Sequence, residues 1–332
     1  MNTTNDRDRP ALLALDWGTS SLRAYLMDGD GRVLQMRNTP NGIQALPATG
    51  AAGFEQVFAE AAGEWLAAWP DLPVAAGGMV GSAQGWKEAP YVRCPADVGT
   101  LAAHGVRVKS GLGQDVVIAP GVLLDEPDAA PDVIRGEEIQ IAGALAEDRD
   151  RGASSSFVLP GSHSKWVQVE NGRIIRFSTY MTGELFAVLC SHSILGRLMT
   201  EPTPGPAEAK TAFAMGLQRA RKSRPGEWLN DLFSARTLGL TGRLPQRLLK
   251  DYLSGLLIGH ELVSGLAGAA SILRDKAPLY LVGDGALCRR YAGAFAAMGV
   301  KVAAVLENTA PRGLWEFARA AGLLAQPARH RS

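Results

Sequence analysis

One arrangement of three strands and two turns occurs twice in this 332-residue chain, half a chain apart. Each copy begins with a short apolar run, 11–15 or 157–159, which is typical of a strand buried on both faces. A turn of small, hydroxyl-bearing residues follows, then a second strand, a tight turn containing glycine and a third strand. The remaining predicted strands are 22–27 and 32–36 in the first copy, and 166–169 and 173–177 in the second. Two unrelated hairpins would also explain such a match, but the shared order favours a duplicated fold.

The segments after each copy support the duplication. Helical periodicity covers 54–69 in the first half. In the second half it covers 183–198, most of 201–224, and 248–273. Further strands are predicted at 72–76 and 116–118, and 278–282, 289–298 and 300–305 read as a strand–helix–strand unit. The segment 147–155, charged and then rich in Gly and Ser, reads as a linker. We therefore predict an α/β protein of two domains, 10–148 and 154–328, with a central cleft.

Composition excludes several classes of protein. Lys and Arg number 34 against 33 Asp and Glu, so the net charge of +1 gives no electrostatic footprint for nucleic acid or an anionic membrane. Three cysteines without a CxxC motif argue against a disulfide framework or a zinc site. The apolar run 254–273 contains His260 and Glu261, which favours a buried helix over a membrane span. The polar, acid-containing N-terminus is unlike a secretory signal, so we expect a cytoplasmic protein.

Common catalytic motifs are missing from the sequence. It contains no GxxxxGK[ST], no GxSxG and no HExxH, which argues against a P-loop enzyme, an α/β-hydrolase and a zinc peptidase. Gly283-Asp284-Gly285 lacks the third glycine of a dinucleotide fingerprint.

The first polar turn carries chemistry that suits a phosphorylated ligand. Gly18 lets the backbone approach a bulky anion, and Thr19 and Ser20 add hydroxyl donors. Asp16, at the carboxyl end of a buried strand, is placed to hold Mg²⁺ through water. An ordinary polar turn in which Asp16 caps nearby N–H groups is the alternative. The second turn at 161–165 favours a nucleotide, whose phosphates need donors from both walls of a cleft.

Several strings resemble one family of kinases. The string 16–19 is similar to the first phosphate loop of the sugar kinase and actin superfamily, whose ribonuclease H-like (actin-like ATPase) domains are duplicated in this way. Within it, the chain resembles the 2-dehydro-3-deoxygalactonokinases. The strings that carry this resemblance are AAGGMVGS (75–82), GWKEAPY (85–91), RGEE (135–138), PGSHSKWV (160–167) and MTGEL (181–185). The resemblance spans nearly the whole chain and implies ATP-dependent phosphorylation of 2-dehydro-3-deoxy-D-galactonate at its terminal hydroxyl.

The resemblance also implies roles for individual residues. Asp16, Gly18, Thr19 and Ser20 match the first phosphate loop; Gly161, Ser162, His163 and Lys165 stand where the second belongs. Lys165 is also a catalytic candidate that would neutralise a phosphate oxygen, and a solvated strand lysine is the alternative. This second loop lacks the aspartate found in many superfamily kinases, so the general base stays open. Glu137 and Glu138 open a helix on which superfamily members place an acidic group. Adjacent helical residues point about 100° apart, so only one faces the cleft, and Glu138 is preferred; helix capping is the alternative. Asp97 and Glu184 remain candidates. Gly283, Asp284 and Gly285 occupy the place of the adenosine loop, and a helix C-terminal turn is the alternative for this pair of glycines.

A keto acid substrate calls for a cation, and arginine suits a carboxylate better than lysine does. The candidates for substrate binding are Arg93, Arg135, Lys87, Gly81 and Ser82, with Tyr91 as an aromatic wall and Trp86 in the core. Gly143, Gly255 and Gly259 suit a close helix crossing, expected at a hinge between the domains. The alternatives are a kinase for another sugar or sugar acid, and an ATP-binding regulatory protein. The oligomeric state stays open, a homodimer included.

Overall fold

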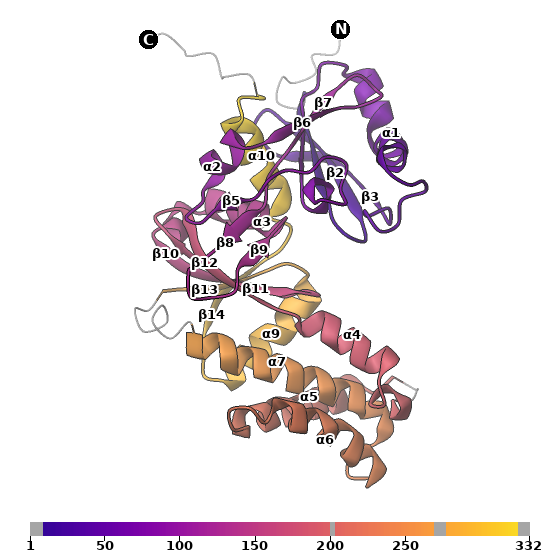
Figure 1. The fold of residues 1–332 in the computed structure, drawn as a ribbon, viewed down its shortest axis with the longest axis vertical. Helices are drawn as coiled ribbons and strands as arrows, with labels where there is room; N and C mark the ends of the chain where they lie inside the picture. The colour runs from indigo at the N-terminus through magenta and orange to yellow at the C-terminus, as the bar shows by residue number, and fades with distance from the viewer. Residues whose placement is uncertain (1–8, 200–202, 269–276, 325–332) are drawn as a thin grey trace. The chain divides into compact units, whose positions relative to one another are not determined.

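The computed structural model describes residues 9–199, 203–268 and 277–324 (Figure 1). The predicted polar start of the chain at 1–8 and the last five residues of the predicted helix 248–273 lie outside them. Contacts group the described residues into two units. Unit 1 comprises those within 1–154, 167–177 and 308–332; unit 2 comprises those within 155–166 and 178–307. The predicted domain ranges, 10–148 and 154–328, stay a prediction, and the helix after residue 309 groups with unit 1.

Unit 1 is built on a six-stranded sheet in the order β3-β2-β1-β4-β7-β6. Its strands are β1 (Pro10–Trp17), β2 (Leu22–Asp28), β3 (Val33–Thr39), β4 (Val74–Gly77), β6 (Val106–Lys109) and β7 (Asp115–Ile118). The first three are antiparallel neighbours, whereas β4 pairs parallel with both β1 and β7. The antiparallel β6 closes the far edge. The predicted strands are confirmed, and β6 is an element that the sequence analysis missed.

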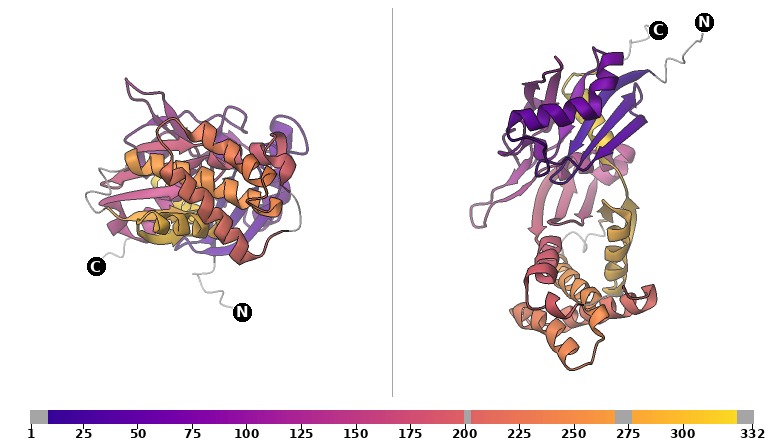
Figure 2. Two further views of the ribbon diagram at one scale, coloured as in Figure 1. Left: turned by 90° about the horizontal axis from the view of Figure 1, so that it is seen from below. Right: turned by 90° about the vertical axis from the view of Figure 1, so that its right-hand side faces the viewer.

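The alternation of side chains along β1 explains the layers of unit 1. Leu13, Leu15 and Trp17 pack in one core cluster with α1 (Ala51–Ala68). The opposite face is covered by α3 (Glu137–Glu147) and α10 (Ala310–Ala320): a Cβ at Gly77 would lie 3.1 Å from Ile139 and 3.2 Å from Leu314. Figures 1 and 2 show α1 and the yellow α10 on opposite faces of this sheet. Burial on both faces is why β1 reads as an unbroken apolar run.

Smaller elements complete unit 1. A three-stranded sheet in the order β5-β8-β9 consists of β5 (Val92–Arg93), β8 (Val122–Leu124) and β9 (Asp132–Ile134). The short helix α2 (Val98–Ala103) is capped by Asp97, whose carboxylate accepts from Thr100 N–H at 2.8 Å. The segment predicted as a linker contains one turn of 3-10 helix at Arg149–Gly152.

The second sheet repeats the topology of the first. Its order is β12-β11-β10-β13-β14, formed by β10 (Ser154–Leu159), β11 (Ser164–Glu170), β12 (Arg173–Tyr180), β13 (Leu279–Val282) and β14 (Val302–Leu306). In both sheets the first strand lies between the second and the fourth, and the fourth pairs parallel with the first. This order is that of ribonuclease H-like domains, so the predicted duplication is confirmed.

Unit 2 also contains the helices α4 (Thr182–His192), α5 (Pro206–Lys222), α6 (Trp228–Leu240), α7 (Leu249–Gly268) and α9 (Gly285–Ala297). The sequence analysis missed α6. Helices α5 and α7 cross at glycines, since a Cβ at Gly255 would lie 2.0 Å from Phe213 O and one at Gly216 would lie 2.0 Å from Tyr252 O. No helix among the described residues is long and apolar enough to cross a membrane.

The expectation that Gly143, Gly255 and Gly259 form one helix crossing between the domains is wrong, because each lies at a crossing inside a single unit. Gly255 and Gly259 pack α7 on α5 inside unit 2. Gly143 instead belongs to a crossing of α3 and α10 in unit 1, where its Cβ would lie 1.9 Å from Thr309 O. A sequence indicates that a glycine permits close approach, but the partner helix depends on the fold.

Candidate active site

Three chain segments of unit 1 converge at the carboxyl ends of its parallel strands. Asp16 on β1 is aligned with Gly77 on β4. The next residue, Gly78, has φ +92°, and a Cβ there would lie 2.8 Å from Trp17 O. Gly136, with φ +105°, precedes α3, and its Cβ would lie 3.3 Å from Gly78 Cα. Only glycine fits these two positions without strain. Asp16, Gly78 and the start of α3 therefore share one edge, where ligands of open α/β sheets bind.

Asp16 lies at this edge with its carboxylate partly accessible. Its side chain is 21% exposed, and its Oδ2 lies 3.5 Å from Arg23 Nη1. Burial raises the pKa of Asp16, and the guanidinium of Arg23 partly opposes that rise. Among the described residues no backbone N–H donates to the carboxylate of Asp16, so Asp16 does not cap its turn.

Backbone hydrogen bonds fix the conformation of the first polar turn. Gly18 N–H donates to Ser21 O at 2.9 Å, and Gly18 O and Thr19 O each accept at 3.1 Å, from Ile43 N–H and Gln44 N–H. Thr19 and Ser20 are exposed. A Cβ at Gly18 would meet only Ser21 O, at 3.7 Å. The protein itself therefore leaves room beside Gly18, which is the room an approaching ligand needs.

A second group of predicted residues comes together around Arg135. Its Nη2 donates to Ala89 O at 2.8 Å, and its guanidinium lies 4.3 Å from the centre of the Tyr91 ring. A Cβ at Gly81 would lie 2.9 Å from Arg135 Nη1. Among the described residues, this Nη1 and the Oγ of Ser82 are buried polar atoms without a hydrogen-bond partner. Burying a polar atom without a hydrogen bond destabilises the fold, unless a ligand or a water molecule supplies the missing partner.

The other predicted substrate residues are placed differently. Arg93 is 68% exposed and forms an ion pair of 2.6 Å with Asp125. Lys87 is exposed. Trp86 packs in the core against Trp17 and Phe54, as the sequence analysis favoured. The charge of Arg93 is thus already matched, whereas Arg135 keeps an unused donor.

The two glutamates at the start of α3 have opposite environments. Glu138 is 1% exposed, and its Oε2 accepts from Gly136 N–H at 2.7 Å. Burial, reinforced by the nearby charge of Glu137, raises the pKa of Glu138 to about 8. Glu137 is only partly buried, and its Oε2 accepts from Arg135 N–H at 2.9 Å. Glu138 therefore faces the interior, and Glu137 is the more accessible carboxylate.

The second polar turn, in unit 2, is fixed by the N-terminus of α4. Ser162 O accepts from Glu184 N–H at 2.9 Å, and His163 Nε2 forms a short hydrogen bond with the carboxylate of Glu184. Ser162 and His163 are exposed, and a Cβ at Gly161 would meet nothing within 4 Å. Lys165 is 8% exposed, with its Nζ donating to Thr179 Oγ1 at 2.9 Å, so it is not a solvated surface lysine.

The Gly283–Gly285 segment begins a helix. Gly283 has φ +137° and donates its N–H to Leu306 O at 3.1 Å. Asp284 caps α9, its Oδ1 accepting from Leu287 N–H at 2.9 Å. A Cβ at Gly285 would lie 2.2 Å from Glu307 Oε1. The alternative of a helix C-terminal turn is wrong, and the placement after β13 agrees with the strand expected there.

The sequence analysis missed the residues behind the second turn. Glu261 on α7 and Tyr291 on α9 are buried and hydrogen-bonded to each other at 2.6 Å. The only signal was the position of Glu261, an acid within an otherwise apolar run.

Comparison with known proteins places the chain in a family. The model of the 2-keto-3-deoxy-galactonokinase family matches residues 16–317. The 2-dehydro-3-deoxygalactonokinase of Escherichia coli (strain K12) is 37% identical over 298 residues, which is 90% of this chain and 94% of the relative. The protein of Rhizobium meliloti (strain 1021) named "Probable 2-dehydro-3-deoxygalactonokinase DgoK1" is 38% identical over 92% of this chain and 96% of its own length.

A solved structure agrees with these relatives. It is the crystal structure of a Sinorhizobium meliloti protein to which 2-dehydro-3-deoxygalactonokinase activity is provisionally assigned, with a TM-score of 0.79 and 33% identity over 93% of this chain and 98% of the other. Family model, sequence relatives and structure all cover nine-tenths or more of the chain. The chain therefore belongs to the 2-keto-3-deoxy-galactonokinase family, a family of carbohydrate kinases.

Proposed function

We propose that this protein transfers the γ-phosphoryl group of ATP to the terminal hydroxyl of 2-dehydro-3-deoxy-D-galactonate, giving the 6-phosphate. Membership of the kinase family supports the reaction class. The observation that carries the proposal is the group around Arg135, where Nη1 of Arg135 and Oγ of Ser82 are buried without partners. A sugar acid has a carboxylate and several hydroxyls, which would form hydrogen bonds with these two atoms.

The carboxylate of the acceptor binds Arg135 in this proposal. The guanidinium is held by Ala89 O on one nitrogen and by the face of Tyr91, so the remaining N–H groups have a fixed direction. A planar, preorganised donor suits a carboxylate and loses little entropy on binding. Ser82 Oγ bonds a carboxylate oxygen or a hydroxyl, and Gly81, where a Cβ would lie 2.9 Å from Arg135 Nη1, lets the guanidinium lie against the backbone. In this proposal Arg93 and Lys87 do not bind the carboxylate, and any contact they make with the acceptor is at the exposed edge of the site.

ATP binds both polar turns. In unit 1, Thr19 and Ser20 present exposed hydroxyls to phosphate oxygens, and Gly18, whose own N–H is bonded to Ser21 O, leaves room for the anion. In unit 2, Gly161 likewise leaves room, the exposed Ser162 and His163 contact the phosphates, and Lys165 supplies a positive charge. The room that the protein leaves beside Gly18 and Gly161 supports this assignment, because no packing within the protein demands glycine there. Gly283, Asp284 and Gly285 contact the ribose and base.

Mg²⁺ suits Asp16 on chemical grounds. The ion prefers oxygen ligands, keeps several waters and is commonly held by one or two carboxylates together with phosphates. The described residues contain no group of three or more side chains that would cage a metal, in agreement with such an open site. When bound there, Mg²⁺ neutralises charge on the phosphate oxygens. Asp16 would then exchange part of its interaction with Arg23 for the ion.

Glu137, rather than Glu138, orients the acceptor hydroxyl. Phosphoryl transfer needs mainly positioning and charge neutralisation, so an accessible carboxylate near the acceptor suffices. Glu138 is enclosed and holds the N–H of Gly136. This reverses the preference drawn from the sequence for Glu138, because the structure supplies the rotation of α3 that the sequence leaves undetermined.

An ADP-release assay coupled to NADH oxidation tests the proposal. The purified protein receives ATP, Mg²⁺ and one acid from a panel that includes 2-dehydro-3-deoxy-D-galactonate, its gluconate epimer and simple aldonates. We expect the galactonate acid to raise ADP release far above the background with water. A higher rate with another acid would assign a different sugar-acid kinase, and no rise with any acid would leave only an ATP-binding regulatory role.

The proposed reaction involves small molecules, and we place it in the cytoplasm, where ATP is available. A homodimer, left open by the sequence, would appear in light scattering as twice the mass of one chain.

A further inference from the structure

Helix α7 carries a buried glutamate that has not been given a role. Glu261 is 2% exposed. Its Oε1 accepts from Trp166 Nε1–H at 2.9 Å, and its Oε2 accepts from the Tyr291 hydroxyl at 2.6 Å. The hydroxyls of Thr182 and Ser164 lie close enough to the carboxylate to oppose the rise that burial causes in the pKa of Glu261. The two donors come from β11 and α9, and Thr182 opens α4, so the Glu261 side chain meets three elements around the second polar turn.

The hydrogen bonds around Glu261 run in one direction. A carboxylate only accepts, so the Tyr291 hydroxyl donates its proton to Glu261. The Tyr291 oxygen is then free to accept from Ser164 Oγ, which lies 3.0 Å away. The Ser164 oxygen in turn accepts from Gly161 N–H, at 3.5 Å. This series of hydrogen bonds therefore connects the buried carboxylate of Glu261 with the N–H of Gly161, the first backbone N–H of the turn.

The same carboxylate also reaches the other support of the turn. Thr182, 9% exposed, opens α4, and its hydroxyl lies near enough to Glu261 to lower the pKa of that carboxyl. The following residue, Gly183, packs so closely that its Cβ would lie 2.4 Å from Gly161 O. Glu184 then holds Ser162 O and His163. Both the strand and the helix that flank the turn are thus tied to Glu261.

We propose that Glu261 is the positioning residue of the 161–165 turn, holding its backbone in the conformation that receives the phosphates of ATP. The inference rests on the proposed nucleotide role of that turn and adds a residue that does not touch the nucleotide itself. Outer-shell residues of this kind, which orient the groups that make the contact, typically change affinity by about 10- to 100-fold when altered.

The test is steady-state kinetics of Glu261→Gln. The amide retains the size of the side chain but offers one acceptor where two donors point, so Tyr291 or Trp166 loses its bond. We expect the KM for ATP to rise about tenfold or more, with the KM for the sugar acid within about twofold of wild type. The thermal shift produced by ADP should shrink in parallel, which gives a readout independent of turnover. An unchanged KM for ATP would overturn the inference.

Tyr291→Phe is the second variant, in case Glu261→Gln fails to fold. It removes the middle hydroxyl and keeps the ring in its core cluster. We expect the same selective rise in the KM for ATP. If both single variants fold, the double variant should raise the KM for ATP by less than the combined effect of the two single variants. The reason is that both substitutions interrupt the same series of hydrogen bonds. Full additivity would count against the proposal.

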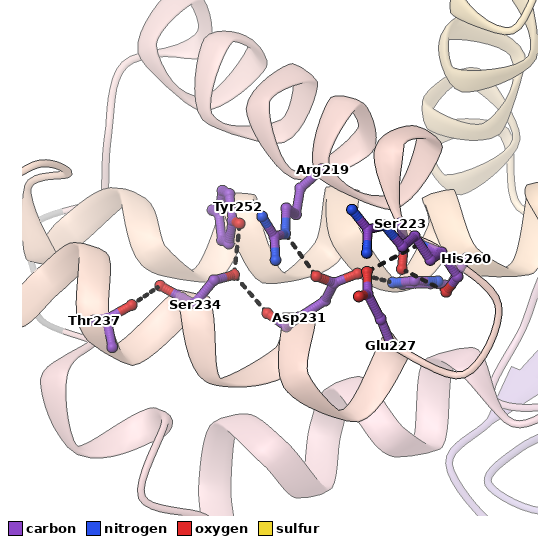
Figure 3. Close-up of polar contacts among 9 residues, drawn as sticks. Arg219, Ser223, Glu227, Asp231, Ser234, Thr237, Tyr252 and His260 are labelled. Atoms are coloured by element: carbon purple, nitrogen blue, oxygen red, sulfur yellow. Dashed lines mark hydrogen bonds and ion pairs between the residues drawn. The ribbon is translucent and has the colours of Figure 1, made fainter.

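Asp231→Asn is the matched control. Asp231 is also a fully buried carboxylate of unit 2, and it pairs with Arg219 Nε at 2.6 Å and His260 Nε2 at 3.2 Å (Figure 3). His260 is the neighbour of Glu261 on α7, yet the cluster in Figure 3 joins α5, α6 and α7 and none of its labelled residues belongs to the turn. We expect a lower melting temperature with the KM for ATP unchanged. An equal rise in the control would mean that general destabilisation explains the effect.

A further pair of variants separates the inference from the proposed function. Ser162→Ala and Lys165→Met alter the turn directly. If both leave the KM for ATP unchanged, the turn is not a phosphate site, and the proposed nucleotide role fails together with the inference. If they raise it and Glu261→Gln does not, only the positioning role is refuted.

Discussion

Replacing Glu138 by glutamine should stabilise the protein in a way that depends on pH. In the folded state burial holds the pKa of Glu138 near 8, compared with an ordinary value of 4.5. Between these two values the folded protein keeps a proton on Glu138 that the unfolded chain releases, so the free energy of unfolding falls as pH rises. Glutamine is neutral throughout and retains an oxygen for Gly136 N–H. The variant therefore lacks this loss.

The size of the effect follows from the two pKa values. One pKa unit corresponds to about 1.4 kcal/mol, so the change from 4.5 to about 8 sets an upper bound of about 5 kcal/mol. At pH 5 the variant and the wild type should differ by less than about 1 kcal/mol, because Glu138 is protonated in the fold and pH 5 lies only half a unit above the ordinary pKa of 4.5. The advantage of the variant should grow up to pH 8 and then level off.

Urea unfolding of both proteins at pH 5, 6.5 and 8 measures this difference, with the exposed Glu60→Gln on α1 as control. The control should show no comparable trend. A difference between Glu138→Gln and wild type that stays constant across these pH values would refute the burial argument. The same variants also test catalysis: Glu138→Gln should retain turnover while Glu137→Gln loses it. The opposite outcome would restore Glu138 as the acidic group of the reaction.

Four further changes have defined outcomes. Asp16→Asn should lower kcat by about 100-fold or more in the ADP-release assay, since a carboxylate is the natural Mg²⁺ ligand; normal turnover would remove its metal role. Arg135→Lys should raise the KM for the sugar acid by about tenfold or more and spare that for ATP, because an ammonium cannot bind a carboxylate through two nitrogens. Gly143→Ala should cost about 1–3 kcal/mol in urea unfolding, because its Cβ would lie 1.9 Å from Thr309 O. Gly63→Ala on α1, with nothing within 4 Å, should instead stabilise by about 0.5–1 kcal/mol.

The strands of both meanders were predictable because their signals are local. Asp28 accepts from the N–H groups of Asp30 and Arg32 and so closes the first tight turn within five residues. Asn171 and Gly172 both have positive φ, as a two-residue hairpin turn requires. Apolar runs and turn residues of this kind are visible without knowledge of the fold.

Elements without a clear local pattern were missed. Helix α6 exposes Leu229, Phe233 and Leu240 while burying Asp231, so its polarity is inverted relative to an ordinary surface helix. Strand β5 has two residues and is recognisable only through its pairing with β8. Helix α10 was readable in principle, with Pro311 in its first turn and charges at Arg312, Glu316 and Arg319 on one side.

Some residues of the candidate site could likewise be predicted from local sequence, whereas others depend on contacts between distant segments. Asp16 and Gly18 follow from the rule that ligands bind at strand ends, which needs only one strand and one turn. Arg135 could be chosen for its chemistry, but its stacking on Tyr91 joins residues 44 positions apart. Which of Glu137 and Glu138 is enclosed depends on how α3 is rotated against the sheet, and that rotation is set by its crossing with α10 at Gly143.

Helix α7 shows how far a polar residue in an apolar helix can be interpreted. Polar side chains on a buried helix need hydrogen-bond partners, so partners were expected for the buried Glu261 and the partly buried His260 once the helix was taken as buried. Their identity was not, because the partners lie on other elements: Asp231 on α6 for His260, and Trp166 and Tyr291 for Glu261. Adjacent residues point about 100° apart, so the two serve different neighbours. His260 links α7 to α6, and Glu261 links α7 to the residues that support the turn proposed to bind ATP. A substitution at either position removes a buried polar group, yet only the change at Glu261 is expected to alter nucleotide affinity.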